Sequence, residues 1–299
     1  MNYDLRAHQE YVERRYSKQN IQAKIIKDLL ADNEITAKIE QAVELVTEWM
    51  HASYSYQSKL DRLAELHDKD IRAMVEKIVA VTILVTKPAQ FTSVVGSITG
   101  ALKMSNKIDG TKTAAEMLAI VSDTDLFDIY KDSKYESLQL VSNYTLTTAT
   151  LNFIKETKYL PPMVVPPNVV EKNYDYMHLT EPTSMILGKG NHHDGDICLD
   201  SINKFNTIPL SLNIGLLKEL SERPNRELID LDKKKQWLTF VRDSYSIYKA
   251  LIDVGNTFYL GHKTDCRGRT YSQGYHLNSQ GNEFRKAIIE FKDKELIQL

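Results

Sequence analysis

Apolar residues in the first half of the chain recur at the three- and four-residue spacing of helices. This spacing is present in the stretches 1–30, 35–50, 91–102 and 113–121. The stretch 71–85 is almost continuously apolar after Met74, which is typical of a helix buried on all sides. The dipeptide Lys87-Pro88 should end that helix, because a residue before proline avoids the helical conformation.

Capping and turn residues set the boundaries of these helices. Asn33 is a candidate N-cap for the helix that follows it. The dipeptide Asp109-Gly110 predicts a turn between two short helices. A further helix, rich in threonine, is expected over 135–154. Residues 1–160 therefore predict a helical domain.

The pattern changes at 161–167, which reads Pro-Pro-Met-Val-Val-Pro-Pro. Four prolines around an apolar core cannot form a helix, so this segment should be a stiff, extended connector. The glycine-containing loop 188–196 follows it. We take 161–196 as the connector that separates the helical domain from the rest of the chain.

The last third of the chain alternates helical and extended patterns. A helical region interrupted by Pro209 is expected over 197–221, followed by a short polar segment. An amphipathic helix is expected over 237–254, ended by Gly255-Asn256. A strand over 257–260 should then lead into an arginine-containing motif. The whole pattern predicts a mainly α fold with a small β component.

Charge is distributed unevenly along the chain. The formal net charge of the 299 residues is −2, which argues against a generally basic coat for nucleic acid. The stretch 233–269, however, holds eight Lys and Arg against three Asp, a net charge of +5. A local basic stretch on an acidic body indicates a confined phosphate site. Two cysteines are too few for a disulfide framework and fit a reducing cytosol. We see no signal peptide and no apolar run long enough for a membrane span.

The arginine motif reads Lys-Thr-Asp-Cys-Arg-Gly-Arg-Thr-Tyr over 263–271. Gly268 allows a tight turn between Arg267 and Arg269. Arginines two residues apart point to the same side of an extended segment, and arginine is a planar, bidentate phosphate binder. For Arg-Gly-Arg alone, a surface turn with two solvated arginines is the better interpretation, because such short motifs recur by chance.

The longer string is more specific. Residues 265–271, followed by Gln280-Gly281-Asn282 and a basic residue at 286, resemble the DxxGR region of the single-subunit RNA polymerases of phages and mitochondria. Relative to that family, one residue is inserted between 271 and 280. The family's segment contacts the template strand and the RNA–DNA hybrid. The resemblance thus implies nucleic-acid contacts for Lys263, Arg267, Arg269, Tyr271 and Lys286, and structural roles for Asp265, Gly268 and Gly281.

The resemblance also implies a domain plan. The helical order of 1–160 and the proline string are similar to the family's N-terminal domain and its junction with the polymerase. Residues 197–255 would then form a short thumb and 256–299 the start of the palm. In the thumb pattern at 209–213, Leu210 and Ser211 replace a tryptophan and a basic residue, so we expect no thumb phosphate contact there.

In this family, two metal ions held by aspartates carry out nucleotidyl transfer. Those aspartates lie in segments that follow the DxxGR region, and we find no equivalent among the 299 residues. We therefore expect no catalytic and no metal-binding residue in this chain. The resemblance implies the N-terminal subunit of a split, heterodimeric phage polymerase of the phage N-four type, inactive alone, in the cytoplasm of an infected bacterium. A second chain would bring the palm aspartates with their Mg²⁺, and the complex would use nucleoside triphosphates.

The C-terminal region is rich in apolar residues. By the resemblance, the chain would end inside the palm, so part of the core around these residues would come from the second chain. We expect this region to be an unfinished core with an unpaired strand edge and fast amide exchange from residue 258 onward. The residues on which this expectation rests are Phe258, Tyr259, Tyr271, Tyr275, Ile288, Ile289, Phe291, Leu296, Ile297 and Leu299.

Two other functions stay open from the sequence. The first is a non-enzymatic nucleic-acid-binding accessory protein that carries the same motif. The second is an independent metalloenzyme with ligands in the glycine loop. Adjacent histidines rarely converge on one ion, so a solvated loop is the simpler interpretation of that pattern. The loop residues concerned are His192, His193, Asp194 and Asp196.

Overall fold

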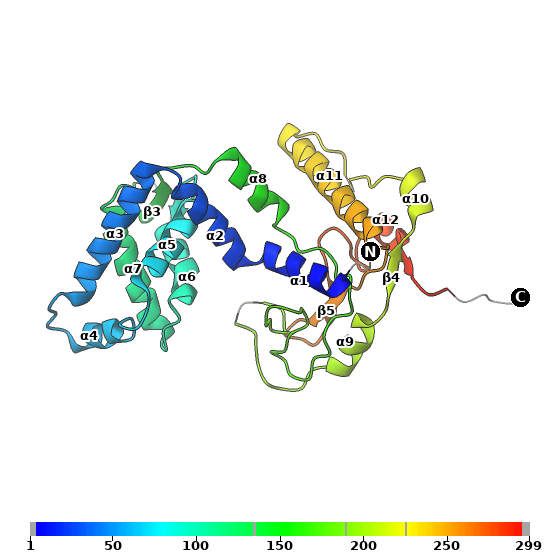
Figure 1. Cartoon of the computed structure of the whole chain (residues 1–299), viewed down its shortest axis with the longest axis horizontal. Coiled ribbons are helices and arrows are strands. Elements are labelled where there is room, and N and C mark those ends of the chain that lie inside the picture. The colour runs from blue at the N-terminus through cyan, green and yellow to red at the C-terminus, as the bar shows by residue number, and fades with distance from the viewer. Residues whose placement is uncertain (1–3, 134–135, 189, 225, 295–299) are drawn as a thin grey trace, which may run out of the picture. The chain divides into compact units, whose positions relative to one another are not determined.

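The structure is a computed structural model that describes residues 4–133, 136–188, 190–224 and 226–294. The chain forms two compact units (Figure 1). Lys18–Lys155 form one unit, and Met1–Ser17 join Glu156–Leu299 in the other. Most of the regular structure is helical and the strands form three small sheets, which confirms the predicted fold class. Within the described ranges, no helix is both long and apolar enough to cross a membrane.

The unit 18–155 is a set of helices around a buried α5. Its helices are α2 (Lys18–Leu29), α3 (Asn33–His51), α4 (Gln57–Ala64), α5 (Ile71–Thr82), α6 (Phe91–Leu102), α7 (Lys107–Ser122) and α8 (Thr148–Glu156). Val75 and Ile78 of α5 are fully buried, as the continuous apolar pattern predicts. A small antiparallel sheet completes the unit, in the order β1 (Ala89–Gln90), β3 (Ser137–Ser142), β2 (Phe127–Asp132).

Several helix boundaries in this unit differ from the predictions. The helix expected over 135–154 is wrong in its first half, because 137–142 is the central strand β3 (Tyr135 lies outside the described residues). The turn expected at Asp109-Gly110 is also wrong. Asn106 caps α7 by accepting from the Ile108 N–H, so the glycine lies in the first turn of a helix. There a Cβ would stand 3.2 Å from Thr99 Cγ2 of α6, so the glycine allows the two helices to approach.

Two further helix boundaries differ near the N-terminus. The N-cap of α3 is Asp32 rather than Asn33, and its carboxylate accepts from the backbone N–H groups of residues 34 and 35. The single helix expected over 1–30 is two helices, α1 (Leu5–Tyr16) and α2, separated at Ser17. Ser17 has an extended backbone, and its N–H and hydroxyl both bond the carbonyl of Arg14. A local bond of this kind competes with the helix and ends it.

The second unit is built around α11 (Leu231–Asp253), which confirms the amphipathic helix and begins six residues before its predicted start. The Asp230 side chain caps it. Its other helices are α1, α9 (Leu199–Asn206), α10 (Ile214–Glu219) and α12 (Glu283–Ala287). Two antiparallel pairs of strands lie beside them: β4 (Leu210–Leu212) with β7 (Ile289–Phe291), and β5 (Gly261–Thr264) with β6 (Thr270–Gln273).

The segment 257–260 precedes a strand rather than forming one. Phe258 and Tyr259 make isolated bridges to Leu210 and Met163, and the regular strand β5 begins at 261. The proline segment 161–167 is not helical, as predicted, but it bends at residues 164 and 165. It is also docked, because Met163 and Tyr259 exchange two backbone hydrogen bonds, of 3.2 and 2.8 Å. Val164 joins the core of the unit.

The expectation that the C-terminal core is unfinished is wrong for the residues between 258 and 288. Phe258 and Ile288 are fully buried, packed with Tyr248 and Leu251 of α11. Only Tyr275 and Phe291 of the described apolar residues in that set are exposed, at 42% and 65%. Leu296, Ile297 and Leu299 lie outside the described residues. The apolar content therefore mostly serves this unit's own core.

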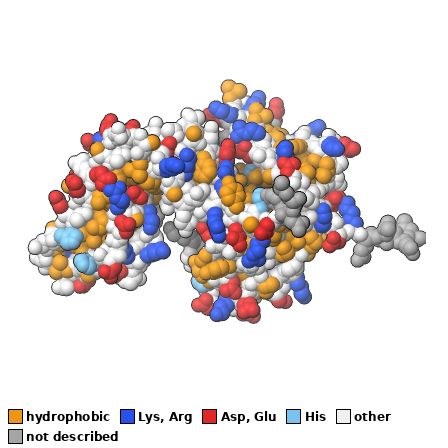
Figure 2. All heavy atoms as spheres, viewed as in Figure 1, with side chains coloured by type: hydrophobic (Ala, Val, Ile, Leu, Met, Phe, Trp, Pro, Cys, Tyr) orange, Lys and Arg blue, Asp and Glu red, His pale blue; other side chains and the backbone are white. Residues whose placement is uncertain are grey.

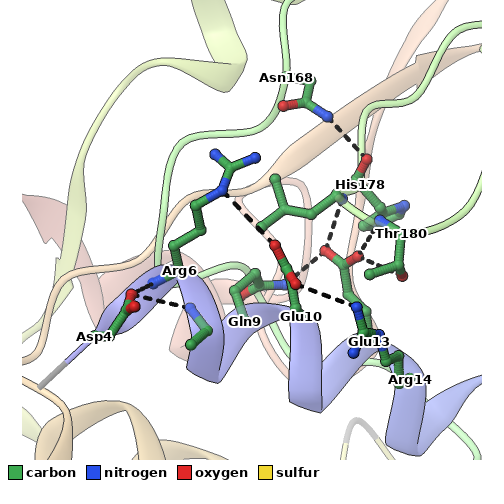
Figure 3. Close-up of polar contacts among 11 residues, drawn as sticks. Asp4, Arg6, Gln9, Glu10, Glu13, Arg14, Asn168, His178 and Thr180 are labelled. Atoms are coloured by element: carbon green, nitrogen blue, oxygen red, sulfur yellow. Dashed lines mark hydrogen bonds and ion pairs between the residues drawn. The ribbon is translucent and has the colours of Figure 1, made fainter.

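A buried polar face fastens α1 to its unit (Figure 3). The Glu13 carboxylate, 5% exposed, accepts from Gln9 Nε2 at 2.9 Å, the Leu179 N–H at 3.1 Å, and the N–H and hydroxyl of Thr180 at 2.9 and 2.8 Å. Gln9 Oε1 in turn accepts from the Val164 N–H at 2.9 Å. These partners are some 155 residues apart in sequence, so the helical pattern could not reveal them.

We expect Glu13→Ala to lower the free energy of unfolding of this unit by about 3 kcal/mol, because three or more buried donors would lose a charged acceptor. In a Trp49→Phe background, Trp237 reports urea unfolding of this unit alone. Glu10→Ala is the matched control: Glu10 lies on the same helix, and its partners Arg6 and Arg14 are exposed. That control should cost less than about 1 kcal/mol, and equal losses in both variants would contradict the assignment.

Candidate nucleic-acid interface

The arginine motif forms the turn of the β5–β6 hairpin. Thr264 and Thr270 are the last paired residues of the two strands. The turn closes with the Gly268 N–H bonded to the Asp265 carbonyl at 3.0 Å and the Asp265 N–H bonded to the Arg269 carbonyl at 2.9 Å. Gly268 has φ +79°, which is the left-handed conformation that favours glycine. The tight turn expected from the sequence is thus present.

One carboxylate organises this turn. Asp265 Oδ1 accepts from the backbone N–H groups of Arg267 and Arg269, at 2.9 and 3.0 Å. Its Oδ2 accepts from Arg269 Nε and Nη2 at 2.9 and 2.8 Å, from Arg267 Nε at 3.3 Å, and from the Tyr271 hydroxyl at 3.5 Å. The carboxylate side chain is 16% exposed, but those of the two arginines are 69% and 54% exposed. Both guanidinium groups are therefore held side by side with donors open to solvent.

The charge of this carboxylate is stabilised in the folded chain. Partial desolvation by itself would raise the pKa of Asp265. The hydrogen bonds from the backbone and the guanidinium of Arg269 outweigh that effect, so the pKa lies below its ordinary value. The Arg269 guanidinium also lies 5.7 Å from the centroid of the Tyr271 ring. The turn thus presents two guanidinium groups that are both bonded to one carboxylate.

The Gln-Gly-Asn part of the motif supports the hairpin from the side. Gln280 Oε1 accepts from the Ser272 N–H at 3.0 Å, and its Nε2 donates to the Thr270 carbonyl at 3.1 Å. The side chain therefore acts like a neighbouring strand for β6. Gly281 follows in a turn, where a Cβ would stand 3.0 Å from the Asn278 carbonyl oxygen. Larger residues would push this support away.

The two predicted lysines lie elsewhere. Lys286 is exposed on α12, which Asn282 caps by accepting from the Arg285 N–H at 2.9 Å. Lys263 is half-buried and donates to the Ser184 carbonyl at 2.9 Å, and burial lowers its pKa. The structure therefore brings together Arg267, Arg269 and Tyr271 around Asp265. It places Lys263 in a structural contact instead.

Sequence reasoning missed a buried ion pair behind α12. The Glu222 side chain, 2% exposed, accepts from Arg285 Nε at 2.9 Å and from Asn282 Nδ2 at 2.6 Å. Arg285 Nη1 also donates to the Tyr275 carbonyl at 3.1 Å. Glu222 lies in a short polar segment with no helical spacing, so nothing in the sequence marks it as buried. The pair holds the helix that carries Lys286.

The glycine loop is held by polar contacts within it and from outside it, including bonds from Asn173 Nδ2 to the carbonyls of His193 and Gly195 at 2.7 and 2.6 Å. His192 lies between the Ser184 hydroxyl, 3.2 Å from its Nδ1, and Asp194, 3.3 Å from its Nε2. His193 Nδ1 accepts from the Gly195 N–H at 3.1 Å. Within the described part of the chain, no three His, Cys, Asp or Glu side chains are grouped so as to hold a metal ion.

His276 lies behind the hairpin, 7% exposed, with Nδ1 2.9 Å from the Ser244 hydroxyl. Ser244 donates its own proton to the Phe240 carbonyl at 2.8 Å, so its oxygen accepts from the His276 Nδ1–H. Burial lowers the pKa of His276 to about 4; Asp243 opposes this shift and Arg285 adds to it. The imidazole is therefore neutral in the folded chain at neutral pH.

This histidine should make the unit less stable in acid. Between pH 6.5 and about 4 the unfolded chain binds a proton that the folded chain does not, so the stabilisation is complete above pH 6.5 and is lost as the pH falls. From pH 7 to pH 4.5 the loss should be about 2–3 kcal/mol. Urea unfolding at several pH values gives the slope of the free energy of unfolding against pH. That slope should be steeper in the wild type than in His276→Gln. The control His51→Gln, at an exposed site of the other unit, should keep the wild-type slope, and a wild-type slope in His276→Gln would refute the prediction.

Charges of both signs are mixed on the visible face of the molecule. On the face shown in Figure 2, Lys and Arg side chains are interspersed with Asp and Glu rather than gathered into a coat of one sign. Cys198 and Cys266 are both exposed and free of disulfide bonds. Together with the formal net charge of −2, this face gives no sign of a generally basic coat.

Comparison with known proteins supports the resemblance that the motif suggested. No family model matches the chain. Over 111 residues the chain is 31% identical to a protein described as a probable DNA-directed RNA polymerase, from Gelasinospora sp. (strain G114). The alignment covers 36% of this chain and 13% of that protein. The chain therefore spans a small part of the length of this relative, and the similarity is to an RNA polymerase.

Proposed function

We propose that this chain is a subunit of a DNA-directed RNA polymerase, a nucleotidyltransferase of phage transcription, and that it binds the template strand and the RNA–DNA hybrid. The observation that carries the proposal is the hairpin turn in which the shielded carboxylate of Asp265 orients two exposed guanidinium groups. Such groups bind backbone phosphates bidentately. The similarity to a probable DNA-directed RNA polymerase supports the same interpretation.

In this proposal the catalytic aspartates, with their Mg²⁺, belong to a second chain that also carries the nucleotide site. The motif itself is a poor place for a metal ion, because both oxygens of Asp265 accept hydrogen bonds from the arginines that it supports. This chain's own contribution is to bind and orient the nucleic acid. The complex would act on nucleoside triphosphates in the cytoplasm of an infected bacterium.

The variant Asp265→Asn tests the proposal. It keeps the size of the side chain but removes the charge that holds the guanidinium groups. Binding of a fluorescent RNA–DNA hybrid with a template overhang should weaken about tenfold, with no change in the Mg²⁺ dependence of the assembled enzyme. Asp253→Asn is the control, since Asp253 pairs with Lys249 on an exposed face of α11.

Two results would count against the proposal. Hybrid binding that is the same in Asp265→Asn and wild type would remove the turn from the interface. A large loss of Mg²⁺ affinity in Asp265→Asn would instead make Asp265 a metal ligand.

A further inference from the structure

Four aromatic side chains form a continuous row on the same unit as the hairpin. The ring centroids of Trp237 and Phe240 are 5.4 Å apart, those of Phe240 and Tyr275 are 5.5 Å apart, and those of Tyr275 and Tyr159 are 3.5 Å apart. The last two rings are nearly parallel, at 7°. Tyr275 is 42% exposed, and the other three are partly exposed. On its inner side the row packs on the buried His276, whose ring centroid lies 5.6 Å from that of Phe240, 5.0 Å from that of Tyr275 and 6.0 Å from that of Tyr159.

Cations lie against the rings of this row. The Arg285 guanidinium is 4.7 Å from the Phe240 ring centroid, and Lys158 Nζ is 5.0 Å from that of Tyr159. The Arg285 guanidinium is also paired with the buried carboxylate of Glu222, so the unpaired positive charge beside the row comes from lysines. Lys233, Lys234 and Lys235 are exposed one turn before Trp237 on α11. The row therefore combines π-faces with positive charge.

The row is also connected directly to the arginine turn. Strand β6 runs from Thr270 to Gln273, so Tyr275 follows Arg269 by only six residues. Between them lies Gly274, where a Cβ would stand 2.0 Å from the Leu277 carbonyl oxygen. The bend at this position requires glycine, and it sets the position of Tyr275 relative to the hairpin. Six residues span at most about 20 Å, which is within reach of one nucleic-acid strand.

We infer that this row, Trp237–Phe240–Tyr275–Tyr159, is a stacking platform for an unpaired strand of nucleic acid whose phosphates reach Arg267 and Arg269. The inference rests on the proposed function and adds the form of nucleic acid that the site takes. Aromatic faces interleaved with cations bind single strands, because every unpaired base offers a π-face and every linkage a phosphate. A duplex hides its bases from such a surface.

The test compares single-stranded and duplex DNA of one sequence, with 2-aminopurine as a stacking reporter. Tyr159→Leu/Tyr275→Leu should weaken single-strand binding about tenfold to a hundredfold and abolish quenching of 2-aminopurine. Duplex affinity and the salt dependence should stay as in wild type. Tyr159→Phe/Tyr275→Phe should restore binding, because the ring is kept. Tyr176→Leu, at a 50% exposed tyrosine of the same unit, is the control.

The outcomes separate this inference from the proposed function. If Arg269→Ala weakens binding but the leucine variants, with wild-type melting temperatures, do not, the platform is wrong and the proposed function stands. If Arg269→Ala also has no effect, the proposed function fails. If the leucine variants bind single strands normally but no longer bind the catalytic chain, the row is a protein contact and the inference is overturned.

Discussion

Replacing both Arg267 and Arg269 by alanine is expected to lower the affinity of this chain for an RNA–DNA hybrid at least a hundredfold. In the proposed complex each guanidinium would make charged hydrogen bonds to phosphates, and losing one set typically weakens binding about ten- to hundredfold. The two side chains share one carboxylate, so their losses should not be independent. Comparing the double variant with the two single variants measures that coupling.

Salt dependence provides the sharper measurement. The slope of log affinity against log salt concentration should fall by about 0.7–0.9 for each phosphate that the protein no longer neutralises. Arg267→Lys/Arg269→Lys should keep most of the slope but lose affinity, because lysine has the charge without the planar fork. Lys249→Ala is the matched control: Lys249 is 76% exposed and paired with an aspartate, as the two arginines are, but it lies on α11. Equal slopes in the double variant and the wild type would place the phosphates elsewhere.

The hairpin turn was predictable because its chemistry is local. A glycine between two arginines, four residues or fewer from an aspartate, is sufficient to suggest a turn stabilised by Asp265, and the structure shows those bonds. The helix α11 was predictable for the same reason, since its apolar spacing and its cap lie within one segment. Local patterns thus indicated the geometry of the candidate site.

Contacts between distant segments could not be predicted in this way. Glu13 and Gln9 look like solvated helix residues until the loop at 179–180 and the connector are placed against them. The ammonium group of Lys263 looks available to phosphate until Ser184 is seen beside it. For β3, the local pattern favours one helix that continues into the threonines, whereas tertiary pairing with β2 decides the outcome. Polar residues change role when a partner from far along the chain buries them.

The second large effect is the gain of RNA synthesis that we expect when the proposed catalytic chain is added. We expect Mg²⁺-dependent RNA synthesis from a primed template by the two chains together and from neither alone. The structural support is at β7: among the described strands it pairs with β4 alone, and its Phe291 is 65% exposed. An open strand edge beside an exposed aromatic ring suits strand pairing with another polypeptide. A permanent interface of this kind buries more than about 2,000 Å².

Hydrogen exchange locates the contact. Because Phe258 and Ile288 are buried in this unit's own core, their amides, which bond the Leu210 and Phe284 carbonyls, should be protected in the isolated chain. The amides of β7 that do not face β4 should exchange fast in the isolated chain and slowly in the complex. Phe291→Lys should abolish assembly, whereas Phe205→Lys, at a 48% exposed phenylalanine of α9, should not.

A catalytic chain with its aspartates replaced by asparagine should still protect β7 without making RNA. RNA synthesis by the isolated chain would refute the two-chain proposal. If the chain binds the hybrid but supports no synthesis when the second chain is added, binding is its whole activity, and that result would favour an accessory protein.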